Sequence, residues 1–227
     1  GFTASRDQAP WGQPGWEIWI CNNLWKLVPD KWHRLYDLHD LATINGDGEQ
    51  TAFLAGQKGK TMAGEPVELA GRPVMCWDPQ PGWATAVEYP KKQIVEFFGD
   101  YFTNSISWMI AHALAENATE IHVYGVDMAT NSEYGAQRPS CEYFLGLAAG
   151  MGVKVYLPPE SDLLKVAFMY GAEDDGPLYA KASAREKELR ERLNVLGQQK
   201  MQVAMQEAQV QGALEDVTYW RSVWISP

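Results

Sequence analysis

Polar side chains follow two predicted strands at the points where a parallel sheet would open toward a ligand. Asn22 comes directly after the apolar run 16–21, and His39 and Asp40 follow the run 32–38. A histidine at a strand tip, followed by an aspartate, is placed as a general base or as a group that orients a ligand. The amide of Asn22 offers donors and an acceptor to a base or a ribose. The alternative for His39 is a structural hydrogen bond to a nearby backbone group.

A second group of candidates lies in the stretch 101–127, which predicts a polar turn, a helix and a buried strand. Asn104 or Thr103 is expected to cap the helix and Ser105 to begin it, so that free backbone N–H groups and a partial positive charge face a phosphate. The strand ends at Asp127. Because ligands of open α/β sheets bind outside the carboxyl ends of the strands, this stretch predicts a nucleotide site.

Two polar segments add further candidates. The segment 129–139 is predicted to be a loop above the sheet, where Glu133, Tyr134 and Arg138 would contact a substrate. The front of the chain is a loop rich in glycine and serine, which resembles the phosphate-binding turn after a first strand; an ordinary solvent loop is the alternative. Its candidate ligand contacts are Gly1, Thr3 and Ser5.

The composition excludes several classes of function. The 227 residues carry a net charge of −10, which argues against a broad duplex-DNA or anionic-membrane footprint, because phosphate contacts need clustered lysine and arginine. The three cysteines are far apart and indicate free thiols in a reducing cytosol. No apolar run reaches the ~20 residues of a transmembrane helix, and the front shows no signal-peptide pattern. We therefore expect a cytoplasmic protein without a membrane partner.

The pattern of apolar residues predicts an α/β fold. Strands are expected at 16–21, 32–38, 73–77, 120–124 and 153–157, and helices at 90–101, 105–116, 140–151 and 163–170. The segment 41–65 is predicted to be a loop with a short helix near 50–56. Repeated βα units predict a Rossmann-like parallel sheet flanked by helices over residues 1–170.

The composition changes after an acidic linker at 171–177. Residues 178–227 are rich in strong helix formers, with opposite charges at i, i+4 spacing. They predict one long helix, or a helical hairpin broken near Gly197 or Gly212. We expect this extension to pack on the sheet or to mediate self-association into a homo-oligomer.

Several motifs together resemble a known family. Residues 104–128, NSISWMIAHALAENATEIHVYGVDM, resemble the core motif of the small bacterial sialyltransferases and their uncharacterised relatives, in which a serine-containing turn starts a helix and the next strand ends in a Gly-hydrophobic-Asp-aromatic signature. The opening GFTASR is similar to the glycine-rich turn of that family, and Cys21-Asn22 to its strand-end asparagine. The resemblance covers residues 1–170. The elements APW, WEIW and LHD also look like uncharacterised proteins of tailed phages.

The resemblance implies a glycosyltransferase with a nucleotide sugar at the carboxyl edge of the sheet. It implies that Asn22 and Ser105 hold the nucleotide, that Tyr134 contacts the phosphate and that a histidine is the base. The acceptor would be a glycan, a small molecule or a modified nucleobase, and the host cytoplasm the location if a phage encodes the chain.

The chain also departs from the family pattern, which leaves alternatives open. No histidine follows His122, where the family's catalytic histidine is expected. The base is therefore His39, or else Glu133 or Asp127. One alternative function is a metal-dependent pyrophosphokinase or phosphotransferase, in which Asp40, Asp127 and Glu133 bind the metal. Another is a non-catalytic phage interaction module that works through the long helix.

Overall fold

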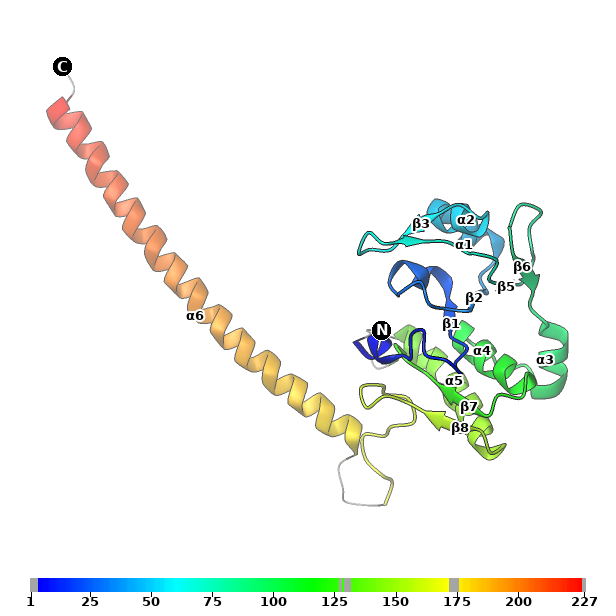
Figure 1. Cartoon of the computed structure of the whole chain (residues 1–227). Helices are drawn as coiled ribbons and strands as arrows, with labels where there is room; N and C mark the ends of the chain where they lie inside the picture. Colours follow the sequence, from blue (N-terminus) through cyan, green and yellow to red (C-terminus); the bar gives the residue numbers. More distant parts are fainter. Residues whose placement is uncertain (1–3, 127, 129–131, 172–175, 226–227) are drawn as a thin grey trace. The chain divides into compact units, whose positions relative to one another are not determined.

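The computed structural model describes residues 4–126, 128, 132–171 and 176–225, and the chain divides into two compact units, Gly1–Leu164 and Lys165–Pro227 (Figure 1). The first unit is an α/β unit and the second consists mainly of one long helix. Each unit is considered by itself below.

The first unit contains a four-stranded sheet in which all neighbouring strands are parallel. The strand order is β1-β2-β5-β6. A further parallel pair, β7-β8, and an antiparallel pair, β3-β4, form two separate small sheets among the described residues. The strands are β1 (Trp19–Cys21), β2 (Arg34–Asp37), β3 (Gly59–Lys60), β4 (Pro66–Val67), β5 (Val74–Cys76), β6 (Ala86–Glu88), β7 (Glu120–His122) and β8 (Lys154–Tyr156). The predicted α/β class with a parallel sheet is confirmed.

The helices of the first unit connect these strands. Two short 3₁₀ helices are η1 (Ala4–Gln8) and η2 (Asn22–Lys26), and the α-helices are α1 (Leu41–Gly46), α2 (Gly48–Leu54), α3 (Lys91–Phe98), α4 (Ser105–Ala115) and α5 (Ser132–Gly150). Asn104 caps α4 as predicted, since its side-chain oxygen accepts a hydrogen bond from the Ser107 N–H.

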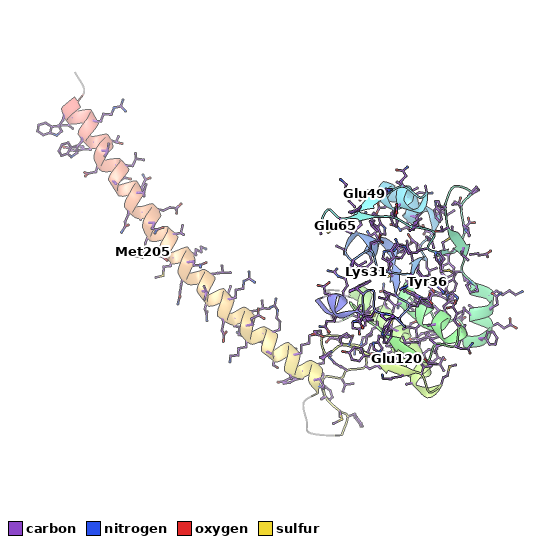
Figure 2. All side chains as sticks on the ribbon, viewed as in Figure 1. Lys31, Tyr36, Glu49, Glu65, Glu120 and Met205 are labelled. Atoms are coloured by element: carbon purple, nitrogen blue, oxygen red, sulfur yellow. The ribbon has the colours of Figure 1, made fainter. Side chains whose placement is uncertain are left out.

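The sheet is covered on both faces, and β2 shows this directly. Leu35 belongs to a core cluster with Trp25 and Phe53, whereas the next residue, Tyr36, belongs to a second cluster with residues of α4 and α5. Successive side chains of a strand point to opposite faces, so helices or loops must bury each face of β2. Tyr36 lies in the interior of the unit (Figure 2). Burial of both faces is typical of a strand in a parallel sheet.

Several predicted elements are wrong. The segment 132–139 is not a loop but the first part of α5, which runs through Pro139. A proline ring crowds the carbonyl four residues earlier, and here that residue is Gly135, whose backbone adjusts most easily. Residues 41–46 form α1 instead of a loop, and residues 163–170 are turns instead of a helix. His112 of α4 is buried, and its Nδ1 lies 2.8 Å from the Tyr36 hydroxyl.

The second unit contains α6 (Pro177–Trp220), followed by a π-helical turn, η3 (Arg221–Ile225). The helix passes through Gly197 and Gly212 without interruption, so the predicted hairpin is wrong and the single long helix is confirmed. Its 44 residues correspond to about 66 Å. None of them is buried, and Met205 projects from the middle of the helix (Figure 2). No helix in the described ranges combines the length and apolar character needed to cross a membrane.

Candidate functional site

The candidate site is centred on a buried carboxylate at the carboxyl end of β2. Asp37 is only 1% exposed, and both of its oxygens have partners. Oδ1 lies 2.9 Å from Nδ1 of His39, and Oδ2 accepts a hydrogen bond of 2.7 Å from Nε2 of Gln50. A carboxylate removed from water is costly unless it is paired and hydrogen-bonded. These two contacts therefore hold Asp37 in one orientation.

Helix α2 positions Gln50. Asp47 caps this helix, because its side chain accepts hydrogen bonds from the backbone N–H groups of Glu49 and Gln50. The Gln50 oxygen accepts a 2.6 Å hydrogen bond from the indole of Trp25, and its amide also lies 3.4 Å from the Asn22 carbonyl. A continuous network thus runs from Trp25 through Gln50 and Asp37 to His39. Such fully satisfied buried networks make the groups within them rigid.

His39 ends this network at the surface, with 42% of its side chain exposed. The hydrogen bond to Asp37 raises the pKa of His39 above its ordinary value; partial burial opposes this shift, and the charge of Asp40 adds to it. We assign the proton to Nδ1, because a carboxylate oxygen is an acceptor. In the neutral imidazole Nε2 then keeps its lone pair, which is the arrangement of a general base held by a carboxylate.

A cavity of about 190 Å³ lies beside His39. It is lined by His39, Asp40, Leu41, Ile44, Cys76, Trp77, Asp78 and Trp83. The indole N–H of Trp77 donates a 2.7 Å hydrogen bond to the Leu38 carbonyl, which fixes one aromatic wall. Ligand pockets typically measure about 300–1,000 Å³, so this cavity fits one ring of a ligand and not a whole nucleotide.

Asn22 lies at the carboxyl end of β1, next to β2 in the sheet. Its backbone has a φ of 56°, in the left-handed region, and its side-chain oxygen is buried without a partner among the described residues. A buried polar atom without a partner is uncommon in native proteins, and this amide oxygen can accept a hydrogen bond. The structure therefore brings Asn22 and His39 to the same edge, joined through Gln50.

The carboxylate of Asp40 already has a hydrogen-bond partner in the structure. It caps α1 by accepting a 2.7 Å hydrogen bond from the Thr43 N–H. This contact lowers the pKa of Asp40 below its ordinary value. No cluster of three or more histidine, cysteine, aspartate or glutamate side chains that suits a metal occurs within the described part of the chain. The three residues predicted to bind a metal include Asp127, which lies outside that part.

Three other predicted contacts hold the fold together. The hydroxyl of Ser5 is buried and accepts a hydrogen bond from the Gly125 N–H at 3.0 Å. Asn104 caps α4, and its amide donates a 2.9 Å hydrogen bond to the Gln137 carbonyl in α5. Arg138 forms an ion pair of 2.8 Å with Glu142 one turn further along α5. Ser105 is the first residue of α4, and its role remains a prediction.

The remaining predicted residues are only partly covered by the structure. Gly1, Thr3 and Asp127 lie outside the described residues. Glu133 and Tyr134 lie at the start of α5 rather than in a loop, and their side chains are not described. Their roles stay predictions.

The sequence interpretation missed Asp37, Gln50 and Trp77. One signal for Asp37 was present, because it lies two residues before His39 at the end of an extended segment, where i and i+2 share a side. An aspartate between the apolar residues Tyr36 and Leu38 was a second signal. Gln50 gave no signal, because its approach depends on the packing of α2. Comparison of the chain with family models, curated proteins and solved structures finds no match.

Proposed function

We propose that this chain is a transferase that moves a sugar from a nucleotide-sugar donor to an acceptor hydroxyl, with His39 as the general base. The observation that carries the proposal is the His39–Asp37 pair, with Nδ1 and Oδ1 2.9 Å apart at the carboxyl edge of a parallel sheet. Ligands of open α/β sheets bind at this edge, and a carboxylate that orients a histidine is a recurring arrangement for proton abstraction.

The chemistry would follow from this geometry. Nε2 of His39 takes the proton of the acceptor hydroxyl while its oxygen attacks the anomeric carbon of the donor. The bond from that carbon to the donor phosphate breaks, and the nucleotide leaves with the electron pair. Asp37 stabilises the imidazolium that forms, because its carboxylate already accepts the Nδ1 proton. The start of α4 at Ser105 is the candidate partner of the leaving phosphate, through the backbone N–H groups of its first turn.

The cavity beside His39 supports a sugar or a single base ring as its occupant. Its volume of about 190 Å³ and its two indole walls, Trp77 and Trp83, suit a ring with an apolar face. The unpartnered oxygen of Asn22 supports a second contact, to a ligand N–H or O–H group.

A panel of CMP- and UDP-sugars tests the proposal. A donor at 100 times its Kd stabilises the protein by about 2.7 kcal/mol, which a thermal-shift assay detects. With such a donor, His39→Ala should lower turnover by about 10²–10⁴-fold. The matched control is Asp40→Asn, which removes a charge beside His39 and retains a good helix cap. Unchanged turnover in His39→Ala would remove His39 from the mechanism, and a panel without any stabilising donor would count against the function itself.

A further inference from the structure

One stripe of α6 repeats with a period of seven residues. The residues of this stripe are spaced seven apart and are all apolar, and each of their side chains is at least 47% exposed. The positions are Leu189, Leu196, Val203, Val210 and Val217. A straight α-helix has about 3.6 residues per turn, so a sustained repeat of seven keeps one side facing a partner only when two helices wind around each other in a left-handed coiled coil.

A second column lies four residues after each member of this stripe. It contains Leu193, Lys200, Glu207 and Leu214, with Glu186 one heptad before them and Arg221 one heptad after them. Read forward, the column is acid, leucine, base, acid, leucine, base. Read backward, the column has a base wherever the forward reading has an acid, and an acid wherever it has a base. The two leucines exchange places. The column is therefore complementary to itself only when one copy is reversed.

The apolar stripe has the same symmetry. Leu196 and Val210 lie seven residues on either side of Val203, and Leu189 and Val217 lie fourteen residues on either side. Lys200 and Glu207 lie equally far from the point between residues 203 and 204. The midpoints of the two columns therefore lie within half a residue of each other, at residues 203–204, where a twofold axis between two antiparallel copies would pass. A partner with a different sequence would have no need of a pattern that is symmetric about one point of the helix.

We propose that α6 binds α6 of a second copy of this chain as an antiparallel coiled coil centred at Val203. In this pair Leu196 contacts the other copy's Val210, and Leu193 contacts the other copy's Leu214. Lys200 contacts the other copy's Glu207, and the twofold axis makes each of these contacts twice. In a parallel pair in register Lys200 would instead face Lys200, and Glu207 would face Glu207. Charges beside the seam of a coiled coil set the choice of partner and orientation in this way.

Sedimentation equilibrium of the full chain tests the proposal. The wild-type protein should reach twice its 25.5 kDa chain mass. Lys200→Glu and Glu207→Lys should each raise the dissociation constant by roughly tenfold or more, because two attractive contacts become repulsive. The double variant should restore the wild-type constant. Gln198→Glu is the control, because Gln198 lies two residues after Leu196 and therefore on the outer side of the coiled coil. This variant should dimerise like the wild type.

Circular dichroism checks that each variant keeps its helix, as exposed positions should allow. A monomeric wild-type protein at about 100 μM, far above the Kd of a specific dimer, would overturn the proposal. Single variants that dimerise like the wild type would overturn the antiparallel arrangement, because that arrangement places Lys200 against Glu207 twice in each dimer.

Discussion

The Asp37→Asn substitution isolates the contribution of the His39 pair. Asparagine has the same shape as aspartate but carries no charge, so the buried volume is unchanged. The folded-state pKa of His39 is raised, mainly by its hydrogen bond to Asp37. A raised histidine pKa contributes stability that is fully present below the unfolded value of about 6.5 and is lost as the pH rises through the folded value. The variant should therefore lose most stability on the acidic side of neutrality.

The size of the effect follows from the two hydrogen bonds of Asp37. A hydrogen bond to a charged group contributes about 1.5–3 kcal/mol. His39 is 42% exposed, so solvent screening reduces the loss to the lower end of this range or below it, at about 1–1.5 kcal/mol. Above the folded pKa the neutral imidazole can change tautomer and accept at Nδ1 from the new amide, while the amide oxygen still accepts from Gln50. The loss should therefore nearly vanish at about pH 9.

Thermal unfolding at pH 5.5–9 measures the loss, which corresponds to a decrease in Tm of about 2–6 °C on the acidic side. NMR titration of the four histidines gives the second measurement. The pKa of His39 should fall toward its ordinary value in Asp37→Asn and change much less in Asp40→Asn. If His39 titrated alike in the wild type and in Asp37→Asn, the carboxylate would not control the imidazole and the proposed base would lose its physical support.

Other substitutions probe the surroundings of this pair. Gln50→Leu leaves the Trp25 indole N–H without its acceptor. It should lower the free energy of unfolding, measured by urea denaturation, by about 1–3 kcal/mol. An unchanged midpoint of the urea transition would contradict the network. Asn104→Ala removes the cap of α4 and should cost about 1–2 kcal/mol, whereas Asn104→Asp should retain the cap. Burial raises the pKa of the thiols to about 11 in Cys21 and Cys76 and to about 12 in Cys141. A thiol reagent at pH 8 should therefore modify the native protein far more slowly than the unfolded chain, and equal rates would contradict the burial.

The strands that could be predicted from the sequence are those marked by apolar or β-branched residues, β8 included, although its residues are only half-buried or exposed. β5 reads as an apolar run, and all three of its residues are buried. β6 was missed because its three residues, Ala86–Glu88, are half-buried or exposed and carry no apolar pattern. The cap of α4 was predictable because an asparagine cap acts within a single turn, through the Ser107 N–H.

The errors have a common physical origin in local signals that tertiary packing overrides. Pro139 predicted a helix start at residue 140, yet α5 begins at Ser132 because one lost backbone hydrogen bond is small beside the packing of a whole helix. The glycines of the segment 41–65 suggested a loop with one short helix near 50–56. Asp40 caps α1, a helix that was not predicted, whereas Asp47 caps α2, which lies close to the predicted helix. Long-range partners, such as Gln50 for Asp37, leave no trace in local sequence.

The cost of the buried network is itself an argument about function. Replacement of a buried charged pair by apolar residues of similar size is often neutral or stabilising by about 1–4 kcal/mol. Asp37 lies between Leu35 and Tyr36 on one side and Leu38 on the other, so an apolar side chain would fit the pattern of β2. The chain instead places a carboxylate there, supports it with Gln50 and directs it at a histidine that lines a cavity. A structural role alone needs none of these groups to reach solvent, whereas a base for an acceptor hydroxyl needs an oriented imidazole at the surface and a fixed carboxylate behind it.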